Sequence, residues 1–334
     1  MITFLVRGVK CATENAFPKK ENTNGYLRTP MPKARKRKTP ITLTDPTTTT
    51  IHTTSNSNSS SKPKSGRTVI RRFHVLLKLQ TQLQKAAVHD PSKKTELLNV
   101  EREIEDLGGL KTYQRMSVIG QGSDRGGGSE KVLVGWFRGM EMHKLREEKK
   151  LQLLEVGALK PDNYASCSSW IENTPMDLNS RHPAIIEQDF LLLDQESNRE
   201  KWDVISLSLV LNFVPEPLDR GRMLGLAYDF LVDGGHLFVA LPLPCLSNSR
   251  YLDFEHFTGL MKFLGFTQLQ CHWREGGKMV YYFFRKEIRG VGADPGSSQT
   301  RGANSNVIPE RFTKKTVLRQ GNRNNFSIVL CNSR

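Results

Sequence analysis

Short apolar segments alternate with helical segments between residues 151 and 287, and this alternation constrains the fold more than any other feature of the sequence. The apolar segments have the length of strands, and a strand–helix–strand order is typical of an α/β protein with a mainly parallel sheet. The predicted strands cover 151–157, a short stretch ending at 176–178, 184–190, 201–214, 236–242, 267–273 and 278–285. Helices are predicted over 219–231 and 254–264, and a turn at 275–277 predicts a closing antiparallel hairpin.

Acidic residues and a glycine stand where three of the predicted strands end. The first strand ends in Glu155 and Gly157, the second in Asp177 and the third in Asp189. Nucleotide-like ligands bind at the carboxyl ends of the strands in an open α/β sheet, and a glycine there lets the ligand approach the backbone. Asp177 is placed to accept hydrogen bonds from two ribose hydroxyls, and Asp189 from an exocyclic amine such as adenine N6. Aspartate also favours turns, so it is the order of these residues that indicates a site.

Two common nucleotide-binding motifs are missing from the sequence. The glycine-dense stretch 120–129 lacks the G-K-[ST] ending of a Walker loop, so it is either a flexible loop over a ligand or a plain connector. Residues 155–161 contain a single glycine, so the first strand is not followed by a G-x-G-x-x-G fingerprint. The absence of this fingerprint disfavours NAD as the cofactor.

The predicted sheet resembles the class I (Rossmann-like) S-adenosylmethionine-dependent methyltransferase fold, although that superfamily usually has three glycines where this chain has Gly157 alone. Longer strings are similar to those of the fungal nucleolar 25S rRNA adenine-N(1) methyltransferase family, over about residues 111–287. The strings are Tyr113-Gln114-Arg115-Met116-Ser117, Met176-Asp177-Leu178-Asn179-Ser180, Glu187-Gln188-Asp189-Phe190, the strand from Ile205 to Val214, Leu241-Pro242-Leu243-Pro244-Cys245 and Asn248-Ser249-Arg250-Tyr251-Leu252.

This resemblance implies an enzyme that methylates N1 of a specific adenine in large-subunit ribosomal RNA, with S-adenosylmethionine as cofactor and no metal. It implies that Gly157 and Asp177 bind the cofactor and that Asp189, Phe190 and Ser208 line the adenosine pocket. It also implies a nuclear, nucleolar location and pre-ribosomal particles as partners. Animal relatives resemble S-adenosylmethionine sensors that act through protein contacts, so a non-catalytic sensor is the alternative.

Candidate catalytic residues, which would hold the target adenine, stand at the ends of the fourth and fifth strands. Asn212 can hold the adenine edge, and Phe213 or Tyr251 can stack on its face, with Glu216 nearby. Phe213 ends an apolar strand, which favours a place in the core over a contact with the base, and Glu216 is also suited to a surface loop. Cys245 is expected to be structural, because methylation at N1 needs no covalent adduct.

Methylation of adenine N1 requires correct positioning of the base more than it requires proton transfer. Methyl transfer from a sulfonium is an in-line displacement, in which the protein orients the nucleophile and excludes water. N1 has its own lone pair, so no strong general base is required. N1 also lies on the Watson–Crick edge, so a paired target must be unpaired or flipped into the pocket.

Charge divides the chain into a near-neutral middle and two basic ends. Residues 1–72 carry a net charge of +12 and residues 288–334 a net charge of +6, whereas the middle carries −3. The predicted domains are a disordered basic tail over 1–70, a helical hairpin over 71–110, the methyltransferase domain over 111–287 and a basic, flexible C-terminal tail over 288–334. The cluster at 33–38 is suited to nuclear import or to RNA contact, or it is a solvated charge run.

Several classes of protein are excluded by composition. No apolar run approaches the ~18 residues that span a bilayer, so we expect no membrane partner. The apolar block at the start is too short for a signal peptide. The five cysteines are odd in number and never form C-x-x-C, which argues against a disulfide scaffold or a zinc ribbon and predicts a reducing compartment.

Overall fold

The computed structural model describes residues 66–120, 128–144, 149–180, 182–287 and 308–331. All of them belong to one compact unit, residues 40–334. Of the tail predicted to be disordered over 1–70, residues 1–65 lie outside the described residues, as does most of the glycine-dense loop. The prediction is wrong for residues 66–70, which are helical.

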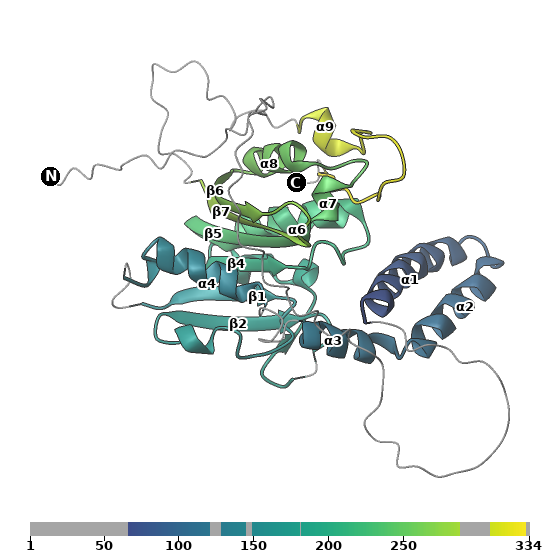
Figure 1. Cartoon of the computed structure of the whole chain (residues 1–334), viewed down its shortest axis with the longest axis horizontal. Helices are drawn as coiled ribbons and strands as arrows, with labels where there is room; N and C mark the ends of the chain where they lie inside the picture. The colour runs from purple at the N-terminus through teal and green to yellow at the C-terminus, as the bar shows by residue number, and fades with distance from the viewer. Residues whose placement is uncertain (1–65, 121–127, 145–148, 181, 288–307, 332–334) are drawn as a thin grey trace, which may run out of the picture. The chain divides into compact units, whose positions relative to one another are not determined.

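A seven-stranded sheet forms the centre of the domain (Figure 1). Its strands are β1 (Leu151–Val156), β2 (Ile171–Asp177), β3 (Ile186–Glu187), β4 (Trp202–Ser208), β5 (Leu231–Pro242), β6 (Phe266–Trp273) and β7 (Met279–Lys286). Their order is β3-β2-β1-β4-β5-β7-β6. The first five are parallel, and β7 is antiparallel to both of its neighbours. This topology confirms the predicted class I methyltransferase sheet with its closing hairpin.

Helices precede the sheet, connect its strands and follow it. They are α1 (Gly66–Ala87), α2 (Lys93–Asp106), α3 (Gly109–Gly120), α4 (Glu130–Gly139), α5 (Gln195–Asn198), α6 (Pro217–Phe230), α7 (Pro244–Ser247), α8 (Phe254–Phe263) and α9 (Glu310–Thr313). Short 3-10 turns are η2 (Met142–Lys144), η3 (Ala165–Cys167) and η4 (Phe190–Leu192).

Both faces of the sheet are buried, which explains why the parallel strands read as nearly continuous apolar runs. Ile205 and Leu207 of β4 belong to the core that also contains α6 and α8, whereas Val204 belongs to the second core, which contains α4. This alternation follows from the period of two in a strand.

The predicted helical hairpin is formed by α1 and α2, which lie side by side (Figure 1). Leu76 and Leu83 of α1 pack with Val100 of α2 in a separate small core. Arg72 donates two hydrogen bonds of 2.6 Å to the carboxylate of Glu103 across the hairpin. The sequence pattern did not predict α3, which starts directly after the glycine turn that ends α2.

The prediction of a flexible C-terminal tail is wrong for residues 308–331. Phe312, Phe326, Ile328 and Leu330 of this segment are buried in the core that contains α6 and α8. The sequence did not reveal this burial, because these apolar residues stand among many basic and polar ones and show neither helical nor strand periodicity. Residues 288–307 lie outside the described part of the chain.

Three smaller differences concern strand limits. Strand β3 covers two residues instead of 184–190, and β4 ends at Ser208 instead of continuing to residue 214. After Ser208 the chain turns sharply, with a positive φ of 58° at Leu209. Strand β5 starts at Leu231 instead of residue 236, so it also includes Gly234 and Gly235.

Candidate functional site

The carboxyl ends of three adjacent strands bring the predicted cofactor residues together. Val156 at the end of β1 pairs with Met176 of β2 on one side and with Leu207 of β4 on the other. Gly157, Asp177 and Ser208, each one position further on, therefore lie side by side at one edge of the sheet.

Gly157 has a backbone that other residues adopt only under strain. Its φ is +77°, and a Cβ atom built on it would lie 2.9 Å from Cγ2 of Val210. Its amide donates a 2.8 Å hydrogen bond to the carbonyl of Met176, which fixes the turn after β1. A side chain added here would fill the space between Gly157 and Val210.

Glu155 is buried near the end of β1. Its two carboxylate oxygens accept hydrogen bonds from Nδ2 of Asn163, at 2.6 Å, and Nδ2 of Asn173, at 2.9 Å. Burial nevertheless raises the pKa of Glu155 to about 7, because it disfavours the charged form more than the two amides favour it. Sequence reasoning placed an acid here but gave it no partners.

Glu155 should therefore make stability depend on pH. The pKa of Glu155 is about 7 in the folded state, against an ordinary value of 4.5. Between these two pH values the folded state therefore binds more protons than the unfolded state. The free energy of unfolding consequently falls as the pH rises through this range. Relative to Glu155→Gln, the wild type should lose roughly 3 kcal/mol between pH 4 and pH 8. Urea unfolding at both pH values measures the difference. Glu172→Gln, at an exposed position of β2, is the control and should leave the wild-type pH dependence in place.

Asp177 ends β2 in a half-buried position. Its carboxylate accepts a 2.9 Å hydrogen bond from the amide of Asn179, and burial raises the pKa of Asp177. Nε2 of Gln114, on α3, donates a 2.8 Å hydrogen bond to the carbonyl of Asn179. Oε1 of Gln114 is buried without a hydrogen-bond partner among the described residues. Gln114 was missed as a site residue, although the Tyr113–Ser117 string contained it.

The three remaining cofactor candidates differ in what their side chains contact. The carboxylate of Asp189 accepts a 2.9 Å hydrogen bond from the amide of Leu191 and caps η4. The ring of Phe190 is buried and packs edge-on against Phe230, so any role in the adenosine pocket would fall to its backbone. Oγ of Ser208 shares a short hydrogen bond with Oγ of Ser129, just before α4.

Residues 209–216, which we call the target loop, carry two of the three catalytic candidates. Asn212 is buried, and its Oδ1 has no hydrogen-bond partner in the described part of the chain. Phe213 contacts Tyr113 of α3 edge-on, with ring centroids 5.4 Å apart, and Tyr113 stacks on Phe73 of α1 at 5.0 Å. Tyr251 comes from the chain after α7, where its amide donates a 3.0 Å hydrogen bond to Oγ of Ser249.

Cys245 lies at the start of α7, half-buried. Burial raises the pKa of Cys245 to about 12, although the nearby cations Lys78 and Arg220 lower it. The thiol is therefore protonated and a poor nucleophile, which agrees with a structural role.

The described residues show neither a metal site nor a membrane span. They contain no group of three or more His, Cys, Asp or Glu side chains that could hold a metal ion. They also contain no helix that is long and apolar enough to cross a membrane.

Solved structures of methyltransferases match this chain only in part. A CurJ carbon methyltransferase is 15% identical with a TM-score of 0.41, covering 62% of this chain and 70% of its own. The 1,6-didemethyltoxoflavin-N1-methyltransferase of Burkholderia thailandensis is 13% identical with a TM-score of 0.35, covering 47% and 87%.

Sequence relatives and a family model identify the chain. A 25S rRNA adenine-N(1) methyltransferase of Schizosaccharomyces pombe is 36% identical over 231 residues, which are 66% of this chain and 81% of the relative. The 25S rRNA (adenine(2142)-N(1))-methyltransferase of Saccharomyces cerevisiae is 33% identical over 231 residues, 68% and 62% of the two chains. Since the model of the 25S rRNA (adenine(2142)-N(1))-methyltransferase family, Bmt2, matches residues 98–328, the chain belongs to that family.

Proposed function

We propose that this chain transfers a methyl group from S-adenosylmethionine to N1 of an adenine in 25S ribosomal RNA. The family match over residues 98–328 is the observation that carries this proposal. The sheet topology supports it, because the strand order and the antiparallel β7 are those of class I methyltransferases.

The residues at the carboxyl edge fit the cofactor. Gly157 leaves the space that a side chain would fill, and Asp177 offers a half-buried carboxylate to the ribose hydroxyls. Oε1 of Gln114, which lacks a hydrogen-bond partner in the part of the chain that the structure describes, is a buried acceptor next to the same strand end. We assign cofactor binding to Gly157 and Asp177, with Asp189 and Ser208 at the edge of the adenosine pocket.

The target loop carries side chains that can orient the target adenine for methyl transfer. When bound, S-adenosylmethionine supplies an electrophilic methyl group on a sulfonium. Oδ1 of Asn212, which is buried and has no hydrogen-bond partner among the described residues, is an acceptor suited to the exocyclic N6 amine of adenine, the group next to N1. A hydrogen bond there orients the N1 lone pair without a general base. Phe213 and Tyr251 are our candidates for stacking on the base.

The test is direct. Full-length protein is incubated with isotopically labelled S-adenosylmethionine and large-subunit rRNA that lacks the modification, and digested nucleosides are identified by mass spectrometry. Labelled N1-methyladenosine is the expected product. Cofactor binding without any labelled nucleoside would contradict the proposal and support the sensor alternative.

We further propose that the enzyme acts in the nucleolus on pre-ribosomal particles. The Watson–Crick edge of the target must be accessible, which is easier before the rRNA is fully folded. Residues 1–65 carry 12 Lys and Arg against 3 Asp and Glu, and such a segment binds polyanions through counterion release. The cluster at 33–38 is suited to nuclear import.

Removing residues 1–65 should weaken RNA affinity and its salt dependence. Each phosphate contact contributes about 0.7 to 0.9 to the slope of log affinity against log salt, so the slope should become less steep by several units. The cut stops at residue 65 because Val69 and Phe73 of α1 are buried. Filter binding at a series of salt concentrations measures the slope, and S-adenosylmethionine affinity should not change. An unchanged slope would show that the segment makes no RNA contact.

A further inference from the structure

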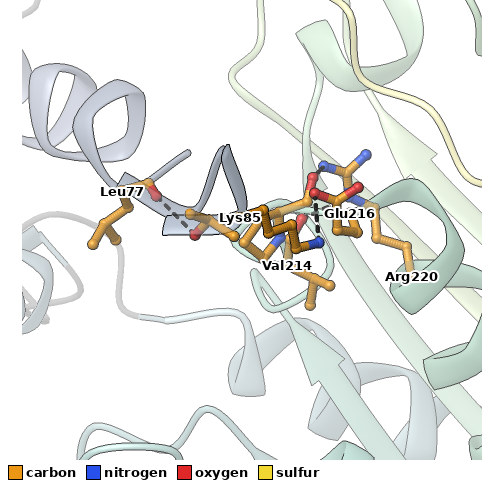
Figure 2. Close-up of polar contacts among 7 residues, drawn as sticks. Leu77, Lys85, Val214, Glu216 and Arg220 are labelled. Atoms are coloured by element: carbon orange, nitrogen blue, oxygen red, sulfur yellow. Dashed lines mark hydrogen bonds and ion pairs between the residues drawn. The ribbon is translucent and has the colours of Figure 1, made fainter. Parts of the chain in front are cut away.

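A buried arginine lies directly behind the target loop. Arg220 is in the first turns of α6, and its side chain is 3% exposed. Its Nε donates to the carbonyl of Val214 at 2.8 Å and its Nη2 to that of Pro215 at 2.9 Å, so one guanidinium binds two consecutive carbonyls of the loop (Figure 2).

The same guanidinium also reaches the C-terminal segment. Its Nη1 donates a 2.5 Å hydrogen bond to the carbonyl of Ser327, and its central carbon lies 4.5 Å from the centre of the Phe326 ring. The amide of Val329 donates a 3.0 Å hydrogen bond to the carbonyl of Pro217, next to the loop. Arg220 therefore joins the target loop to a segment about 110 residues away in the sequence.

The target loop also contacts the helical hairpin through one ion pair. Nζ of Lys85, on α1, lies 3.1 Å from Oε1 of Glu216, and both side chains are partly exposed (Figure 2). An exposed ion pair of this kind contributes little, usually below 1 kcal/mol. The fixed position of the loop therefore depends on Arg220 more than on Lys85.

Burying a charged guanidinium carries a large desolvation cost. Burial lowers the pKa of Arg220 to about 10, and all three of its hydrogen-bond acceptors in the described part of the chain are backbone carbonyls. An apolar residue would fill this position without that desolvation cost. Lysine has no planar fork with which to bind three acceptors at once. The geometry thus favours a role that requires simultaneous contacts to the loop and to the C-terminal segment.

We propose that Arg220 is a positioning residue for the target adenine, which holds the Asn212–Phe213 turn in place by fixing the two loop carbonyls that follow it. This proposal rests on the proposed function. A displacement of about 1 Å in a reacting group can cost about 100-fold in rate, so loss of these contacts acts on turnover. Cofactor binding depends on the ends of β1 and β2 and is not affected.

The test compares Arg220→Lys and Arg220→Gln with a matched control, Phe312→Leu. Phe312 anchors the same C-terminal segment, but on α8, where its ring contacts His256 and Phe263. Both Arg220 variants should lower kcat by about 100-fold with KM for S-adenosylmethionine within twofold of wild type. Phe312→Leu should lower the melting temperature and keep kcat within threefold.

Hydrogen exchange of the peptide covering 209–216 gives a readout that needs no activity. Exchange should be faster in the Arg220 variants and unchanged in Phe312→Leu. If the wild type labels no adenine, the proposed function fails while exchange still tests the role of Arg220. The role of Arg220 is refuted if kcat and exchange stay at wild-type values, if cofactor binding is lost together with activity, or if Phe312→Leu has the same effects.

Discussion

Gly157→Arg abolishes S-adenosylmethionine binding and leaves the protein folded: this is the expected result at the end of β1. The φ of +77° costs a side chain about 1–2 kcal/mol, and its Cβ would meet Val210 at 2.9 Å. Both costs lie below the 5–15 kcal/mol that stabilises a typical domain. The arginine side chain would extend over the strand edge shared with Asp177 and Ser208 and occupy the cofactor's space. Calorimetric titration should show at least about a 100-fold loss of affinity, equal to about 2.7 kcal/mol.

A matched control separates the site from backbone strain. Gly276, in the turn between β6 and β7, has a φ of +67° and no atom within 4 Å of an added Cβ. Gly276→Arg should therefore suffer the same backbone cost and bind the cofactor normally. Wild-type affinity in Gly157→Arg would show that the cofactor binds elsewhere, and rRNA methylation by that variant would show the same.

Deleting residues 308–334 should prevent the domain from folding to its native state. The deletion removes five buried apolar side chains: Phe312, Phe326, Ile328, Val329 and Leu330. Each contributes about 1.5–3 kcal/mol on burial, so the loss is roughly 10 kcal/mol, as large as the whole stability of a typical domain. It also leaves the guanidinium of Arg220 without the carbonyl of Ser327.

Circular dichroism and thermal unfolding measure this outcome. The truncated chain should show no cooperative transition, or should precipitate because the apolar surface of α6 and α8 is exposed. A shorter deletion, of residues 332–334 only, is the control and should melt like the full chain. A cooperative transition near the wild-type temperature in the longer deletion would mean that the segment is an accessory to the fold.

The sheet was predictable because its signals are local. A parallel strand buried on both faces needs a short apolar run, and the turns between elements need residues such as Gly, Pro and Asp. Strand β1 and the pair β6–β7 were therefore found within a residue of their limits, whereas β4 was found but predicted too long. The alignment of Gly157 with Asp177 followed from the same rule, since parallel strands end at one edge of the sheet.

The environment of each site residue was not predictable. The sequence indicated Asn212 and Phe190 as neighbours of a ligand, but the structure places the ring of Phe190 in the core and leaves Oδ1 of Asn212 buried without a described partner. Burial and hydrogen bonding depend on residues that are distant in the sequence. Gln114, which contacts the end of β2 from 65 residues away, was missed for this reason.

The local pattern of residues was enough to predict the order of the strands, the acids and the glycine at the strand ends, and the basic character of both ends of the chain. It could not show that residues 308–331 belong to the domain or that Arg220 connects them to the target loop, because both depend on contacts between distant segments. Local pattern depends on residues a few positions apart, whereas this contact joins residues 107 positions apart. A segment without helical or strand periodicity shows its role only when its apolar side chains meet the surface that buries them.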